Sequence, residues 1–253
     1  MTDSSKDTTL SPGRGLLFPL TGVALLIVAA LLMAAAGIGT RLGFWHFRTG
    51  FDLLRYGAYC GSAAAVVALA ATVHSFRKGR RLGLLLALLA VAGAGALTAV
   101  PVTWKMSAGR LPRIHDITTD MTNPPAFVAV IPLRQGAPNP ALYGGPEIAA
   151  LQRQGYPDIK TVVLDLPMAA AFDKALTTAR TMGWQIVASA PQEGRIEATD
   201  TTLWFGFKDD IVIRVAPAGN RSLVDIRSVS RVGISDVGTN ARRIRNFAGK
   251  LAG

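Results

Sequence analysis

The residues best suited to chemistry form one run near the end of the chain, residues 225–247. This run, DIRSVSRVGISDVGTNARRIRNF, is typical of a strand, a glycine-marked turn and a helix. The first turn of a helix has unpaired backbone N–H groups that attract anions, and a guanidinium group matches a carboxylate or phosphate with two parallel bonds. We therefore predict an anion-binding site made of Arg227, Arg231, Gly233, Ser235 and Gly238.

Two structural alternatives to an anion site stay open. Asp236 directly precedes the predicted helix, and a capping carboxylate at that position takes the place of an external anion. Because side chains alternate along a strand, Asp225, Arg227 and Arg231 also share one face. A solvated sheet face with cross-strand ion pairs, each contributing about 1 kcal/mol or less, gives the same pattern.

Catalysis is the functional alternative, and it depends on His115, the one histidine after Trp104. A Ser-His-Asp triad would need this residue, so the candidate catalytic set is His115, Asp116 and Asp120. Aspartates of this kind also form turns and helix caps. The sequence has no phosphate-binding loop, dinucleotide glycine fingerprint or nucleophile elbow, and no cysteine after Trp104. We therefore expect no cofactor and no metal, and we favour a binding module over an enzyme.

The elements that must position these residues begin near residue 160. Apolar side chains alternate in several short runs, as in strands, and follow a three/four spacing in two longer runs, as in helices. The predicted strands are 161–166, 184–188, 195–207, 211–216 and 223–231, and the predicted helices are 167–183 and 237–251. The order β-α-β-β-β-β-α predicts an α+β fold, an antiparallel sheet with helices on one face.

The first part of the chain is far more apolar than an ordinary soluble domain. Residues 15–40, 56–76 and 82–104 contain no Asp, Glu, Lys or Arg, and each is long enough for a helix across about 30 Å of hydrocarbon. The predicted organisation is a disordered tail at 1–14, three transmembrane helices in 15–104, a proline-rich wrapping connector at 105–159 and an α+β domain at 160–253.

Charge indicates how the protein lies in its membrane. The net charge is +11, and four of the five residues 77–81 are basic. Basic loops stay in the cytoplasm, which places the C-terminal domain outside it, in a multi-pass protein of the inner cell membrane. Cleavage of the first apolar segment near residues 34–36, as in a signal peptide, is the alternative. Basic and acidic residues alternate after Arg110, so we expect a lipid bilayer as partner and no nucleic acid.

Small residues recur at every fourth position in the apolar segments, for example at Gly57, Gly61 and Ala65. Such faces let helix backbones approach closely. Packing within the three-helix anchor explains them, and a helix-mediated homo-oligomer is the alternative.

Five motifs in the second half resemble a known family: HDITTD, PPAF, GRIEATD, GFKDDIVIR and DIRSVSRVGISDVGTNARRI. Over about residues 110–251 the chain is similar to the bacterial and plastid domain-of-unknown-function family 1499. The resemblance implies a domain boundary near residue 110 and carries no activity. We expect an integral membrane protein whose extracytoplasmic domain binds an envelope protein or an anionic lipid head group. The alternative is an enzyme acting on an envelope lipid or glycan.

Overall fold

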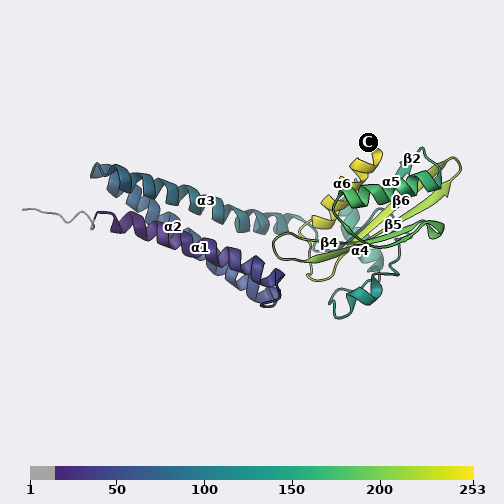
Figure 1. Cartoon of the computed structure of the whole chain (residues 1–253), viewed down its shortest axis with the longest axis horizontal. Helices are drawn as coiled ribbons and strands as arrows, with labels where there is room; N and C mark the ends of the chain where they lie inside the picture. Colours follow the sequence, from purple (N-terminus) through teal and green to yellow (C-terminus); the bar gives the residue numbers. More distant parts are fainter. Residues whose placement is uncertain (1–14) are drawn as a thin grey trace, which may run out of the picture. The chain divides into compact units, whose positions relative to one another are not determined.

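The computed structural model describes residues 15–253, so the disordered tail predicted at 1–14 lies outside the described residues. The chain divides into two compact units, with the boundary between Lys105 and Met106. The first unit holds α1 (Leu17–Arg41), α2 (Phe47–Arg77) and most of α3 (Arg81–Arg110) (Figure 1). Each helix is long and apolar enough to cross a membrane, which confirms the prediction of three long apolar helices.

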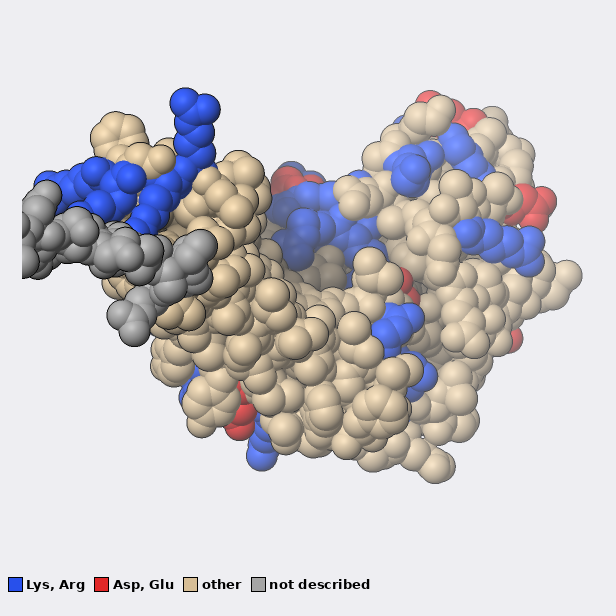
Figure 2. Space-filling model, turned by 60° about the vertical axis from the view of Figure 1, so that its left-hand side comes forward, with Lys and Arg blue, Asp and Glu red and all other residues tan. Residues whose placement is uncertain are grey.

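Small side chains let the helices of the first unit pack closely. A Cβ atom at Gly57 of α2 would come within 2.6 Å of Met33 of α1, and one at Gly22 of α1 would touch Ala68 of α2. Large apolar side chains stay exposed, and the surface of these helices is largely uncharged (Figure 2). Such a surface suits contact with lipid, because burying it in water-free surroundings is favourable.

The second unit is built on one antiparallel sheet with the strand order β1-β6-β5-β4-β3, and β2 also pairs with β6. The strands are β1 (Asp116–Thr118), β2 (Val162–Leu164), β3 (Gln185–Ala190), β4 (Arg195–Thr201), β5 (Lys208–Ala218) and β6 (Arg221–Ser230). The helices are α4 (Gly145–Gly155), α5 (Met168–Thr181) and α6 (Thr239–Ala252), with short 3-10 turns η1 (Ile131–Arg134) and η2 (Pro191–Glu193). From β2 onward the order is β-α-β-β-β-β-α, which confirms the predicted α+β class.

One face of the sheet forms the apolar core. Ile213 of β5 and Ile226 of β6 are register partners and fully buried. Helices α5 and α6 cover them, and Phe247 of α6 stacks on Trp184 with ring centroids 5.4 Å apart. Gly183 has a φ of 78° and ends α5, a conformation that favours glycine. The alternation of apolar residues along the strands therefore decides which face the helices cover.

The other face of the sheet is covered by residues 119–143 of the connector. Phe127 and Val130 of this segment pack on Val212 and Val229 of the sheet. The alternative of a solvated sheet face is therefore wrong, because the connector covers the charged side chains beneath it. The connector also supplies β1, η1 and α4 to the second unit.

Several predicted boundaries differ from the structure, among them that of the strand predicted at 211–216, which is Lys208–Ala218, and for two of them the reason is local. The strand predicted at 195–207 ends at Thr201, because Thr202 and Phe207 close a turn through two hydrogen bonds. The last helix begins at Thr239 instead of residue 237, since Val237 and Gly238 have φ values of 50° and 75°. Residues with positive φ cannot continue into a right-handed helix.

Candidate functional site

Arg227 of β6 lies beneath the connector and holds a carboxylate. Its Nε and Nη2 atoms donate to Asp116 of β1 over 2.9 and 2.7 Å, in the paired geometry that a guanidinium group favours. The rings of Phe127 and Tyr143 lie over the guanidinium carbon, with centroids 5.2 and 5.3 Å away. Arg227 is only 2% exposed. An external anion would therefore have to displace Asp116 from this arginine.

Arg231, directly after β6, is engaged in the same way by Asp210 of β5. Its Nε and Nη2 atoms donate to the two carboxylate oxygens over 2.9 and 2.8 Å, and Arg134 of the connector donates over 2.6 Å. Burial raises the pKa of Asp210, but the bonds from Arg231, Thr199 and Arg134 outweigh it and hold the pKa below its usual range. Asp210 is therefore a buried anion shared between two arginines.

Two further clusters complete this face of the sheet. Glu197 of β4 is fully buried and accepts the backbone N–H groups of residues 128–130 over 2.9–3.1 Å, together with a bond from Arg195. Arg214 of β5 donates to Asp225 and Asp120 over 2.7 and 2.9 Å. We call the whole set the arginine layer: Arg134, Arg195, Arg214, Arg227 and Arg231 with Asp116, Asp120, Glu197, Asp210 and Asp225. The pairs of Arg134, Asp120 and Asp116, together with the bonds from residues 128–130 to Glu197, fix the connector onto the sheet.

The turn before α6 is occupied by its own carboxylate. Asp236 accepts the backbone N–H groups of Gly238 and Asn240 over 2.9 and 2.6 Å, and Ser235 accepts that of Val237 over 3.2 Å. Burial, with a smaller effect of the Asp209 charge, raises the pKa of Asp236 above its usual range despite those bonds. The geometry matches the alternative in which Asp236 caps the helix. The anion site predicted from Gly233, Ser235 and Gly238 stays a prediction.

The three catalytic candidates brace the connector and do not meet at one open cleft. His115 Nδ1 lies 3.4 Å from the carbonyl oxygen of Ile234, in the loop before α6. Asp116 is paired with Arg227, and Asp120 accepts the backbone N–H groups of residues 122 and 123. Among residues 15–253 no hydrogen bond joins the His115 ring to a carboxylate, so this histidine lacks the partner that orients a general base.

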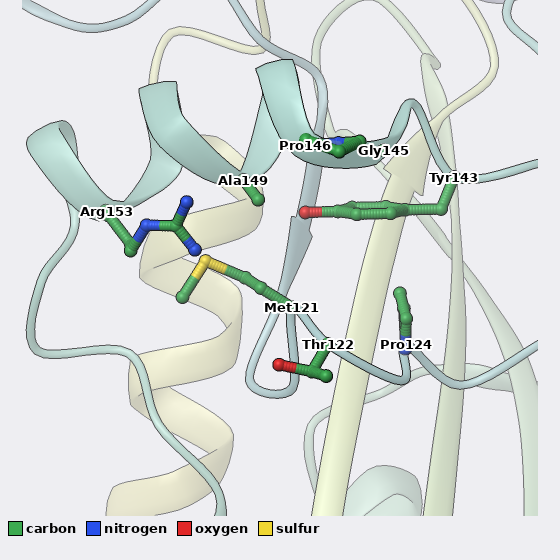
Figure 3. A pocket seen from close by; sticks show the side chains of 8 residues that line it. All are labelled: Met121, Thr122, Pro124, Tyr143, Gly145, Pro146, Ala149 and Arg153. Carbon is green, nitrogen blue, oxygen red and sulfur yellow. The ribbon is translucent and has the colours of Figure 1, made fainter.

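A cavity of about 350 Å³ lies at the edge of the arginine layer (Figure 3). Its walls come from the two ends of the connector's covering segment and from α4. They are formed by Met121, Thr122, Pro124, Tyr143, Gly145, Pro146, Ala149 and Arg153. Figure 3 shows the hydroxyl of Tyr143 and the guanidinium of Arg153 directed toward the same space beside Met121 and Ala149.

Comparison with known proteins places the domain in a family. The family described as "Protein of unknown function (DUF1499)" matches residues 116–251, more than half of the chain. The chain belongs to the DUF1499 family. No curated protein matches it. The matched range begins with β1 and ends within α6, so the DUF1499 domain includes the sheet, the arginine layer and the cavity.

The cavity of this DUF1499 domain offers hydrogen-bond donors that are not already used. The Tyr143 hydroxyl is buried and has no hydrogen-bond partner among residues 15–253. Burial, with a smaller effect of the Asp116 charge, raises the pKa of Tyr143 to about 12, so the hydroxyl keeps its proton at neutral pH. Arg153 is exposed at the rim of the cavity. It makes no ion pair with any other residue in the range 15–253. The arrangement can receive a small anion.

The sequence analysis did not predict this cavity, because it predicted no helix at the position of α4, and the other lining residues come from a segment without helical or strand periodicity. Tyr143 is followed by two glycines and a proline, and Gly145 has a φ of 72° at the start of α4. This glycine-rich turn before a proline was the one local sign that a helix begins at the cavity. No group of three His, Cys, Asp or Glu side chains that could hold a metal occurs among the described residues.

Proposed function

We propose that this DUF1499 protein is a membrane-anchored binding module whose cavity at Tyr143 and Arg153 takes the anionic group of an envelope molecule. The observation that carries the proposal is the pairing of a buried, unused hydroxyl with an arginine that no carboxylate neutralises. Every arginine of the arginine layer already has a carboxylate partner. Arg153, which lines the cavity, has no such partner to compete with an added anion.

The chemistry of the two groups favours binding over proton transfer. A hydroxyl with a pKa of about 12 and a guanidinium group both remain protonated near neutral pH. They donate hydrogen bonds to a phosphate or carboxylate without exchanging a proton. Met121, Pro124 and Ala149 line the rest of the cavity with apolar surface, and charge-assisted hydrogen bonds beside such surface are stronger than in bulk water.

The proposal places the DUF1499 domain outside the cytoplasm, in the bacterial cell envelope and anchored in the inner membrane. The four basic residues among 77–81, at the turn between α2 and α3, support this orientation. A reporter enzyme fused after Gly253 is expected to be active on the outer side. Activity only on the cytoplasmic side would reverse the orientation.

The binding site is tested by titrating the full-length protein in detergent micelles with glycerol phosphate, a small soluble phosphate monoester. Arg153→Gln is expected to weaken binding about tenfold, the equivalent of one charged hydrogen bond of roughly 1.4 kcal/mol. Arg180→Gln on α5, also exposed, removes the same charge far from the cavity and is expected to bind like the wild type. Equal affinity of all three proteins, or no binding by any, would remove the cavity as the site.

A further inference from the structure

The segment that covers the arginine layer has an unusual charge distribution. Residues 121–146 contain one charged residue, Arg134. That arginine points inward, is 6% exposed and donates to Asp210 of the sheet. The segment therefore contributes no charged side chain to the outer surface of the domain.

Apolar side chains take the place of charges on this outer surface. Val128, Ile131, Leu133 and Leu142 are 56%, 45%, 51% and 83% exposed. Three of them lie in or just before η1, where Ile131 donates to the carbonyl of Val128. Single exposed apolar residues are common, but a group of them on an uncharged segment marks a contact surface.

The arginine layer draws both ends of this segment together next to the cavity. Arg227 donates from Nη1 to the carbonyl of Pro125 over 3.3 Å and from Nη2 to that of Ala141 over 2.8 Å. The neighbouring residues Pro124 and Tyr143 line the cavity. Leu142 therefore directly precedes a cavity-lining residue, Tyr143, in the chain.

We infer that the outer surface of residues 121–146 docks on the bilayer, so that the cavity receives the phosphate of an anionic phospholipid. This inference rests on the proposed function and names its ligand. A phospholipid carries a phosphate close to apolar chains, which matches a cavity with Arg153 in its lining and the exposed Leu142 next to Tyr143 in the chain. The chain tethers the domain to the candidate membrane helices by a short link, since only residues 111–115 separate the end of α3 from β1. Residues 121–146 contain no Asp or Glu, so their apolar side chains meet anionic head groups without charge repulsion.

The test uses the full-length protein, one copy per nanodisc, in phosphatidylcholine with phosphatidylglycerol. The native Cys60 is first replaced by serine, and single cysteines at Leu133 and Leu142 are labelled with bimane. Thr177→Cys, exposed on α5 across the sheet, serves as the control. We expect a blue shift and strong quenching by nitroxide-labelled lipid at 133 and 142, and neither effect at 177. Leu142→Glu is expected to abolish the quenching at 133, and its exposed position leaves the fold intact.

Three outcomes overturn the inference. Quenching at 133 and 142 no stronger than at 177 excludes lipid contact. A blue shift without lipid quenching assigns the surface to a protein partner. Loss of the blue shift on dilution of the discs assigns it to a second copy of the chain. If Arg153→Gln still weakens binding of glycerol phosphate in any of these cases, the proposed function stands and only the lipid is wrong.

Discussion

The two faces of the sheet in the DUF1499 domain are buried by different means. One face packs Ile213 and Ile226 against α5 and α6, where burial is favourable in itself. The opposite face packs arginines and carboxylates under the connector, where each charge must find a partner because an unpaired buried charge costs several kcal/mol. The apolar face therefore tolerates small changes, while the arginine layer depends on every pair. Removing single groups from each face tests this difference.

The largest effect is expected from Asp210→Ala. This change leaves Arg134 and Arg231 buried without their shared anion, which is expected to lower the free energy of unfolding by about 3–5 kcal/mol. Urea unfolding of the full chain in mild detergent, followed by near-UV circular dichroism, measures it. Asp173→Ala, an exposed aspartate on α5, is expected to change stability by less than about 0.5 kcal/mol. A similar loss of stability in both variants would show that the fold does not depend on the ion pairs of the arginine layer.

Acid is expected to weaken the same face. Because the pKa of Asp210 is lowered in the folded protein, its contribution is full above the unfolded value of about 3.9 and is lost as pH falls through the folded value. Asp120 shifts in the same direction, since the bonds to residues 122, 123 and Arg214 outweigh its burial. The raised pKa of Asp236 acts with the opposite sign. The free energy of unfolding should therefore drop below about pH 4.

The variant Asp210→Asn isolates this acid dependence, because it keeps the shape of the side chain and removes the titrating group. Its unfolding midpoint is expected to be lower than that of the wild type at neutral pH and to change less on acidification. Parallel pH curves for the two proteins would contradict the assignment of the acid response to Asp210.

The apolar face is expected to show a smaller effect. Ile226→Val removes one methylene group from a fully buried position opposite Ile213, for a loss of about 1 kcal/mol. The same urea unfolding measures it. A loss as large as that of Asp210→Ala would erase the difference between the two faces.

The apolar face was predictable from sequence because its signal is local. Ile211, Ile213 and Val215 alternate on β5, and this period alone decides which side faces α5 and α6. The ends of the last helix were less predictable. The positive φ of Val237 is rare for a β-branched residue, and the surrounding loop imposes it.

The burial of the arginine layer under the connector was not predictable, because the connector residues lie far in sequence from their partners on the sheet. Asp116 and Arg227 are 111 residues apart, and Glu197 binds backbone N–H groups about 70 residues before it. The alternation of charged residues along the strands predicted a polar face, but no local pattern predicted which segment covers that face. The proline-rich segment that covers it has no hydrophobic periodicity. The cavity joins Tyr143 and Arg153 to Met121, Thr122 and Pro124, and no local pattern predicts that these two stretches lie together.

The smallest effect on stability, and the one that separates folding from binding, is expected for Tyr143→Phe. The Tyr143 hydroxyl is buried without a hydrogen-bond partner among residues 15–253, so removing it sacrifices no bond and relieves a desolvated polar group. We expect the free energy of unfolding to stay equal or to rise by a few tenths of a kcal/mol. The ring remains over Arg227, so the arginine layer keeps its packing.

Binding of glycerol phosphate to Tyr143→Phe should nevertheless weaken about fivefold, since one neutral hydrogen bond contributes roughly 1 kcal/mol. Isothermal titration and urea unfolding on the same preparation measure both quantities. Two results would assign Tyr143 to the packing of the arginine layer and not to a binding site. One is a loss of stability as large as that of Asp210→Ala, and the other is binding of glycerol phosphate equal to that of the wild type.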